Sequence, residues 1–209
     1  MDSYLIEFRF HGYAKKYLKQ TIYEVSIKFR VQGAAKKKVV PHITMFGPFT
    51  TNDERKVVST LLSVSRKHHL MSFKLKGFSN FDNRVIFMDI IPSKELTNFR
   101  KELACEFTKL RNFIIFKTIK TRGISDYEDH FPFHATIAFK DIKKKFTSIL
   151  YYLKNKKTPH IQQKFLRITL LKNGRILYEY DFPQRRLLNR KEALSRDVWR
   201  RTVSLLRNG

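Results

Sequence analysis

The sequence predicts an α+β fold built from two similar lobes, each made of strands and helices in the same order. Three observations support this prediction. Helix-like and strand-like stretches follow the same order in the two halves of the chain. The tripeptides His42-Ile43-Thr44 and His134-Ala135-Thr136 occur 92 positions apart, each in a strand-like apolar run. A turn followed by an arginine and a strand also recurs, with Arg84 and Arg175 91 positions apart.

The first half begins with a strand at residues 4–10, where side chains alternate, and a helix at 13–29, where apolar residues recur at helical spacing. A strand at 39–46 carries the first tripeptide, and we expect Gly47-Pro48 to end it. Thr51 or Asn52 can cap the next helix. The remaining elements are that helix, through 57–62, and two strands at 72–78 and 84–91 joined by a turn at 80–83.

The second half repeats this order, which indicates an internal duplication. Its final hairpin turns at Asn173-Gly174, and an Asn-Gly pair between alternating strands is a strong hairpin signal. The elements are a helix through 96–107 capped by Ser93, a strand at 133–139, a helix at 142–153, and strands at 164–171 and 175–182.

The halves differ most in the connection before each histidine strand. This connection covers about residues 31–41 in the first half and 113–132 in the second. Long irregular loops beside a site often contact the substrate, so we expect Arg122 and Tyr127 of the longer loop to do so.

We divide the chain into a two-lobed domain at 1–183 and a basic helical extension at 184–209. The extension carries eight Arg and Lys residues against Glu192 and Asp197, a net charge of +6. Two interpretations remain open for it. It is either an amphipathic helix docked on the domain with a solvated face, or a surface that binds nucleic acid or a partner.

The charge of the whole chain indicates a polyanionic partner. The 209 residues include 43 Lys and Arg against 18 Asp and Glu, a formal net charge of +25. This exceeds the magnitude of about 2 to 8 that suits the solubility of a small domain. Nucleic acid is the commonest cellular polyanion, so we expect nucleic acid or a nucleotide as the partner.

Cysteine usage and hydropathy limit the protein class. The single cysteine, Cys105, excludes an intramolecular disulfide, and its neighbours Leu103 and Phe107 predict a buried thiol. No signal-peptide layout is present, and no apolar stretch approaches the roughly 20 residues that span a membrane. We therefore expect a cytoplasmic protein with no membrane partner, and we favour a monomer.

Each tripeptide places an imidazole and a hydroxyl on one face of a strand, since residues two apart project to the same side. Two such units facing one another can supply one neutral and one protonated imidazole, as concerted acid/base catalysis requires. The hydroxyls of Thr44 and Thr136 can donate to phosphate oxygens. His42 and His134 could thus help water to open a phosphodiester without a nucleophilic side chain.

A metal site is the main chemical alternative. Two histidines are too few for a usual zinc centre, and no H-E-x-x-H spacing occurs. Four residues of the longer loop could in principle join His134 as ligands: Asp126, Glu128, Asp129 and His130. A Ser-His-Asp hydrolase is disfavoured because no G-x-S-x-G motif exists. We expect neither a metal nor a cofactor.

The paired tripeptides, each followed by an apolar residue (Met45 and Ile137), resemble those of the two-histidine (2H) phosphoesterase superfamily, the group of RNA 2',3'-cyclic phosphodiesterases and 2'-5' RNA ligases. The resemblance covers about residues 1–183. It implies that each lobe is an antiparallel sheet with helices on its outer face, that the site lies in a central cleft between the lobes, and that the site holds no metal. In such a site His42 protonates the leaving O3', His134 activates water, and Thr44 and Thr136 hold the phosphate.

Two further residues are candidates for substrate contact. Some relatives place an arginine shortly after the second tripeptide, whereas Phe139 and Lys140 follow it here, so Lys140 is the candidate replacement for that charge. Phe46 shares the periodicity of His42 and Thr44, and it either flanks the cleft or packs in the core.

The expected function is hydrolysis of RNA or nucleotide 2',3'-cyclic phosphates to 2'-phosphates. Two alternatives remain open. One is 2'-5' RNA ligation, which is the same reaction in reverse, and the other is a non-catalytic RNA-binding module.

Overall fold

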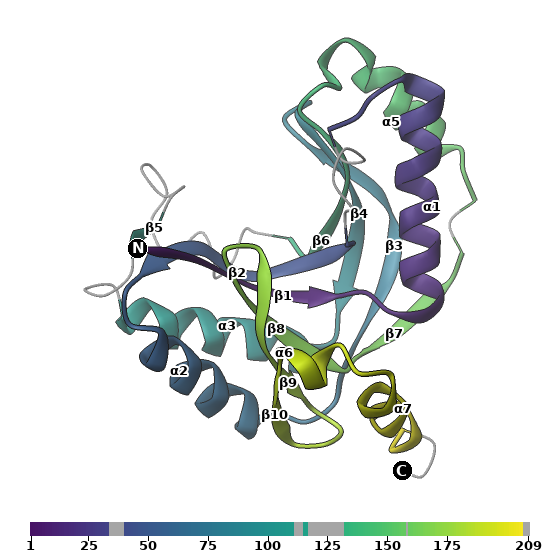
Figure 1. Cartoon of the computed structure of the whole chain (residues 1–209). Helices are drawn as coiled ribbons and strands as arrows, with labels where there is room; N and C mark the ends of the chain where they lie inside the picture. The colour runs from purple at the N-terminus through teal and green to yellow at the C-terminus, as the bar shows by residue number, and fades with distance from the viewer. Residues whose placement is uncertain (34–39, 111–114, 117–131, 158, 207–209) are drawn as a thin grey trace.

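A computed structural model describes residues 1–33, 40–110, 115–116, 132–157 and 159–206 (Figure 1). Its strands form two antiparallel sheets. The six-stranded sheet has the order β10-β9-β8-β1-β2-β5, with β1 (Asp2–Arg9), β2 (His42–Thr51), β5 (Ile115–Phe116), β8 (Arg167–Lys172), β9 (Arg175–Asp181) and β10 (Arg186–Asn189). The four-stranded sheet has the order β6-β4-β3-β7, with β3 (Met71–Phe81), β4 (Val85–Pro92), β6 (His134–Phe139) and β7 (Ile161–Phe165).

Both halves of the chain contribute to each sheet. The β3–β4 hairpin of the first half pairs with β6 of the second, and the β8–β9 hairpin of the second half pairs with β1. The predicted turns are present: Asp82 and Asn83 have φ of 44° and 55°, and Asn173 and Gly174 have φ of 50° and 75°. Two successive positive φ angles match the twist of a hairpin, which explains the Asp-Asn and Asn-Gly pairs. The predicted α+β class with two antiparallel sheets is confirmed.

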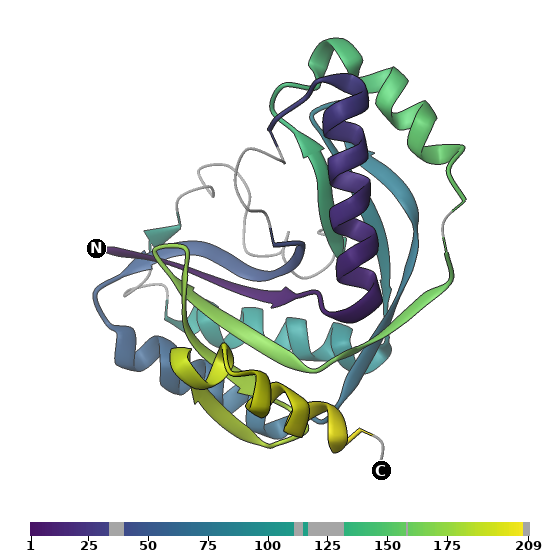
Figure 2. The same ribbon diagram turned by 45° about the vertical axis from the view of Figure 1, so that its right-hand side comes forward.

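Helices cover the outer faces of both sheets (Figures 1 and 2). Two lie along the four-stranded sheet, α1 (Gly12–Phe29) and α5 (Phe146–Lys154), the latter preceded by a short 3-10 turn, η1 (Lys143–Lys145). Two others lie beneath the six-stranded sheet, α2 (Glu54–Lys67) and α3 (Lys94–Lys109). Their first turns follow capping residues: Asp53 accepts a hydrogen bond from the Lys56 backbone, and Ser93 accepts one from that of Leu96.

One aromatic core joins the two sheets. The Phe8 ring of β1 lies 5.2 Å from Phe73 of β3 and 4.7 Å from Phe165 of β7. Phe165 in turn contacts Phe99 of α3 at 6.0 Å. Full burial of a phenylalanine contributes about 1.5–3 kcal/mol. Because strands of both sheets contribute rings to this one core, the two sheets are packed together. This packing fixes the position of one histidine strand relative to the other.

Strand β2 continues past Gly47-Pro48 to Thr51, so the expectation that this pair ends the strand is wrong. Tyr4 pairs with Phe49 and Ile6 with Phe46, and this irregular register accommodates the proline.

The thiol of Cys105 is exposed, contrary to the expected burial. Its neighbours Leu103, Ala104 and Phe107 form the buried stripe of α3. Residue 105 lies about 200° around the helix from 103, so its side chain projects from the opposite face.

The C-terminal segment contains a strand and two helices in place of the one expected helix. Strand β10 pairs with β9, and Asn189 then starts α6 (Arg190–Ala193) with a capping box to Glu192. Ser195 caps α7 (Arg196–Ser204). Arg185 donates hydrogen bonds to the backbone carbonyls of Arg66 and His68, which ties this segment to the end of α2.

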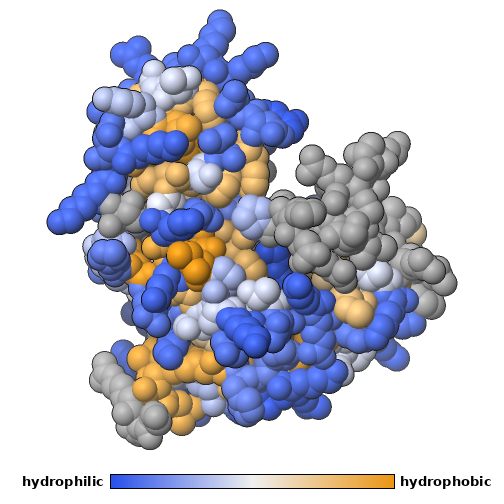
Figure 3. Space-filling model, turned by 180° about the vertical axis from the view of Figure 1, so that it is seen from behind, coloured by the Kyte–Doolittle hydropathy of each residue, from blue (hydrophilic) through white to orange (hydrophobic). Residues whose placement is uncertain are grey.

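The surface is mostly polar. Hydrophilic side chains cover much of the face seen in Figure 3, with smaller hydrophobic areas between them. In the part of the chain that the structure describes, no helix is long and apolar enough to cross a membrane.

Candidate active site

The two tripeptides begin two strands that belong to different sheets and lie against one another. His42 is the first residue of β2, and His134 is the first residue of β6. The two rings are held alike: Nδ1 of His42 lies 3.0 Å from the carbonyl oxygen of Val40, and Nδ1 of His134 lies 3.0 Å from that of Pro132. A carbonyl oxygen only accepts, so Nδ1 carries the hydrogen in both rings. In each neutral ring, therefore, Nε2 is the basic nitrogen.

The surroundings of His134 favour its neutral form. Burial lowers the pKa of His134, and the nearby charges of Arg100 and His42 lower it further. The Pro132 carbonyl and the Asp89 carboxylate act in the opposite direction, but they do not outweigh burial. His134 is therefore neutral and able to accept a proton at neutral pH.

A row of polar side chains crosses the six-stranded sheet from the first tripeptide. Thr44 lies opposite Glu7, Glu7 opposite Thr169, and Thr169 opposite Glu179. Directly opposed residues share a face of a sheet, so these four side chains lie on the face that also carries His42. The Thr169 hydroxyl donates to Glu179 at 2.9 Å.

Glu7 and Arg9 of β1 flank His42. Arg9 is its cross-strand neighbour, and the Glu7 carboxylate lies 3.8 Å from Nδ1 of His42 and 3.4 Å from Nε of Arg9. Burial raises the pKa of Glu7, while the charges of His42 and Arg9 oppose that rise. Our reading of the motifs missed these two residues. Their spacing of two residues in the first strand places both side chains on one face, and this pattern could have identified them from the sequence.

Aromatic side chains surround the second tripeptide. The His134 ring lies 5.0 Å from Phe81 and 5.2 Å from Phe87, and these two phenylalanines are 4.3 Å apart. Phe87 is also the cross-strand neighbour of Thr136, and Asp89 is that of His134. We call Phe81 and Phe87 the aromatic wall. These residues were also missed, because sequence alone did not show which strand pairs with β6.

The other residues that we expected to contact the substrate are not placed at the site by the structure. Phe46 belongs to the core: it is 1% exposed and lies 5.1 Å from the Phe107 ring, so of the two alternatives for this residue core packing is confirmed and a place beside the cleft is wrong. The physical reason is a bulge. Glu7 pairs with Thr44 and Ile6 with Phe46, which leaves Met45 as an extra residue and turns Phe46 to the face opposite Thr44.

Lys140 follows β6 and is exposed, with its ammonium 5.2 Å from the Phe139 ring. No described contact joins it to either histidine. Arg122 and Tyr127 lie outside the described residues, as do Asp126, Glu128, Asp129 and His130. Within the described ranges, no group of three or more His, Cys, Asp or Glu side chains is arranged to hold a metal ion.

Of three similar solved structures, the first has a TM-score above 0.5 and supports the fold. TT0787 of Thermus thermophilus is similar in structure, with a TM-score of 0.59 and 14% identity over 86% of this chain and 97% of that one. E. coli LigT complexed with 3'-AMP gives a TM-score of 0.49 at 12% identity, over 90% and 92% of the two chains. Kluyveromyces marxianus Usb1 gives 0.44 at 9% identity, over 84% and 95%.

No curated protein matches the sequence of this chain. The family model of the 2'-5' RNA ligase superfamily matches residues 26–176, which include both tripeptides, the whole four-stranded sheet and strands β2, β5 and β8 of the six-stranded sheet. The chain therefore belongs to the 2'-5' RNA ligase superfamily, the two-histidine phosphoesterase group that its paired tripeptides predicted.

Proposed function

We propose that this protein hydrolyses 2',3'-cyclic phosphates at RNA ends or on nucleotides to 2'-phosphates, by acid/base catalysis from His42 and His134 without a metal. The observation that carries the proposal is the matched anchoring of the two rings. Both have Nδ1 held by the carbonyl oxygen two residues earlier, so both offer Nε2 for proton transfer.

The unequal surroundings of the rings support unequal roles. His134, whose pKa is lowered by burial, is the general base. Its Nε2 takes a proton from water as the water oxygen attacks phosphorus. The P–O3' bond breaks, and His42 delivers a proton from its Nε2 to O3'. The phosphate remains on O2', and exchange with solvent restores both rings.

Glu7 supports the acid role of His42. Its carboxylate lies 3.8 Å from Nδ1 and balances the charge of the ring while the ring carries a second proton. Arg9 adds a positive charge beside the same ring, where the phosphate would lie.

Thr44 and Thr136 have the same spacing from their histidines, and each shares a strand face with its imidazole. Their hydroxyls are suited to donate hydrogen bonds to the non-bridging phosphate oxygens, where negative charge accumulates during the attack. The aromatic wall beside His134 offers a surface against which a base can pack.

The test is product analysis on uridine 2',3'-cyclic phosphate in the presence of EDTA. We expect uridine 2'-phosphate from the wild type, and loss of turnover in His42→Ala and in His134→Ala. His69→Ala is the matched control, because His69 is exposed and outside the site. Full activity in either active-site variant would contradict the proposal. So would tight, salt-sensitive RNA binding with no turnover, which would indicate a binding module.

The family match also favours 2'-5' ligation as a second candidate. In this reaction the 5'-hydroxyl of a second RNA takes the place of water, so the two histidines keep their roles: His134 takes the proton from the attacking 5'-hydroxyl, and His42 protonates O3' as the P–O3' bond breaks. The test supplies one RNA ending in a 2',3'-cyclic phosphate and another with a 5'-hydroxyl. A 2'-5' linked product that is absent from the His134→Ala reaction would support ligation.

A further inference from the structure

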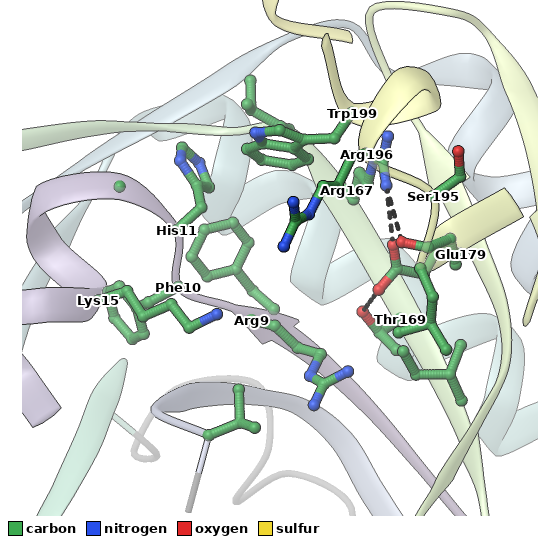
Figure 4. A pocket seen from close by; sticks show the side chains of 17 residues that line it. Arg9, Phe10, His11, Lys15, Arg167, Thr169, Glu179, Ser195, Arg196 and Trp199 are labelled. Carbon is green, nitrogen blue, oxygen red and sulfur yellow. Dashed lines mark hydrogen bonds and ion pairs between the residues drawn. The ribbon is translucent and has the colours of Figure 1, made fainter.

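A cavity of about 440 Å³ opens on the polar face of the six-stranded sheet (Figure 4). Residues from β1, the start of α1, β8, β9 and the C-terminal helices line it. Its volume falls within the roughly 300–1,000 Å³ of small-ligand pockets. The residues that matter for its chemistry are Arg9, His11, Lys15, Arg167, Arg196 and Trp199.

The cavity adjoins the candidate active site. Arg9 lines it and is also the cross-strand neighbour of His42. Val40 lines it too, and the carbonyl of Val40 is the one that accepts the hydrogen bond from His42. A polymeric substrate whose reacting end lies at His42 could therefore continue directly into the cavity.

The cavity carries an excess of positive charge. Lys15 and Arg196 have no carboxylate within 4.0 Å among the described residues. Figure 4 shows the Lys15 side chain reaching into the cavity toward Arg9. Burial lowers the pKa of Lys15, and Lys19 and Arg9 lower it further, as expected where cations gather. Arg167 pairs with Glu179 at 3.3 Å and with Asp181 at 2.8 Å, and Arg9 pairs with Glu7 at 3.4 Å, so Lys15 and Arg196 are the lining cations that are left to attract an anion.

An aromatic surface lies beside these cations. The Arg167 guanidinium sits 4.9 Å from the centre of the Trp199 ring, and the His11 ring lies 5.1 Å from it. His11 is held in turn, since its Nε2 lies 3.2 Å from the carbonyl oxygen of Lys164. The indole is therefore fixed in place. Aromatic rings beside a cationic groove are the combination that binds single-stranded nucleic acid without regard to sequence.

Lys15, Arg196 and Trp199 lie outside the 26–176 range that matches the family model. The cavity is thus built largely by segments that flank the matched region.

We propose that this cavity binds the nucleotide preceding the reacting end of an RNA strand, with Lys15 and Arg196 on its phosphate and Trp199 against its base. The inference rests on the proposed function for the identity of the end placed at His42 and His134. It makes a single-stranded oligoribonucleotide the preferred substrate over a free cyclic mononucleotide.

Trp199 is the only tryptophan in the chain, so its fluorescence reports directly on the cavity. The first experiment titrates the wild type with a five-nucleotide RNA ending in a 2'-phosphate, and with uridine 2'-phosphate. We expect saturable quenching by the RNA at concentrations at which the mononucleotide causes none. Absence of quenching by bound RNA would overturn the proposal.

The variant K15Q/R196Q should weaken binding of this RNA about tenfold or more, and it should reduce the slope of log Kd against log salt by about 0.7, since both side chains contact one phosphate and each phosphate neutralised on a single strand contributes about 0.7. The matched control is K16Q/R201Q, which removes two exposed charges from the same two helices outside the cavity. Equal losses in the two double variants would show non-specific attraction only and would overturn the proposal.

Kinetics separate this inference from the proposed function. K15Q/R196Q and Trp199→Leu should raise KM for the five-nucleotide 2',3'-cyclic phosphate at least about fivefold, since base stacking on an aromatic ring is lost in the second variant. Turnover of uridine 2',3'-cyclic phosphate should stay within twofold. If both substrates are cleaved and neither variant raises KM for the five-nucleotide substrate more than for uridine 2',3'-cyclic phosphate, the cavity assignment fails and the proposed function stands. If neither is cleaved but the quenching and its charge dependence hold, the proposed function fails and the RNA site stands.

Discussion

The two histidine strands carry the same motif but lie beside different neighbours. In the six-stranded sheet, His42 and Thr44 lie opposite Arg9 and Glu7 of β1. In the four-stranded sheet, the equivalent positions of β6 lie opposite Asp89 and Phe87 of β4. The motif supplies the same ring, tautomer and hydroxyl twice. The adjacent strand decides the charge and polarity around each ring, and so separates a candidate acid from a candidate base.

The lobe of the six-stranded sheet, which we call the first lobe, also contains buried charged side chains. In the lobe of the four-stranded sheet, the second lobe, aromatic side chains lie beside the histidine. Arg167, Glu179 and Asp181 form a buried ion cluster in the first lobe. The aromatic wall of Phe81 and Phe87 packs beside His134 in the second. A duplicated motif therefore need not give two equivalent sites, and the following predictions test how unequal they are.

The largest effect is expected from removing both histidines together. Each single alanine variant should lower kcat for a 2',3'-cyclic phosphate by about 10²–10⁴, as for a lost general acid or base. The double variant His42→Ala/His134→Ala should be little worse than the poorer single variant, because groups that act in one step are not additive. Steady-state kinetics check this. Multiplicative losses would mean that the two rings act independently.

The next largest effect concerns the ion cluster of the first lobe. Arg167 donates to Asp181 at 2.8 Å and to Thr202 at 2.5 Å, and Asp181 is fully buried. Arg167→Met should lower the free energy of unfolding by about 3–5 kcal/mol, because it leaves the buried carboxylates of Glu179 and Asp181 without their cationic partner. Urea denaturation measures the loss. The exposed Arg175→Met is the control, and it should change stability by less than about 0.5 kcal/mol.

The two threonines should contribute alike despite their unequal neighbours. Thr44→Val and Thr136→Val each remove one hydroxyl donor, and we expect kcat to fall about 10²-fold in each. Thr44→Ser and Thr136→Ser keep the hydroxyl and should restore most of the activity. A loss confined to one strand would show that a single threonine holds the phosphate.

The smallest effect is a change in pH dependence. Because the pKa of His134 is lowered and the base must be neutral, the acidic limb of kcat/KM should lie below pH 6.5, the ordinary pKa of histidine. Asp89→Asn removes a negative charge that favours protonation, so the limb should move to lower pH. Arg100→Gln removes a positive charge that opposes protonation, so the limb should move to higher pH. Shifts in the same direction would exclude His134 as the group that titrates.

Much of the site could be predicted from short-range pattern. The spacing of His42 and Thr44 in a strand places both on one face without further information, and the recurrence of the pattern at His134 indicated duplication. Phe46 was misplaced because alternation assumes an unbroken ladder, and the bulge at Met45 depends on how β1 pairs with β2. Likewise Phe87 acquires its place beside His134 only through the pairing of β4 with β6.

The sequence by itself determined the helices of residues 1–183, the two hairpins, the duplicated motif and the family, because each follows from local propensity or from residues close together in the chain. Only the tertiary structure decided which strands became neighbours, how each imidazole is surrounded, and that the C-terminal segment closes a cationic, aromatic cavity beside His42. Those features depend on contacts between residues far apart in the chain, such as Arg9 with His42 and Arg167 with Trp199, and no local pattern specifies them.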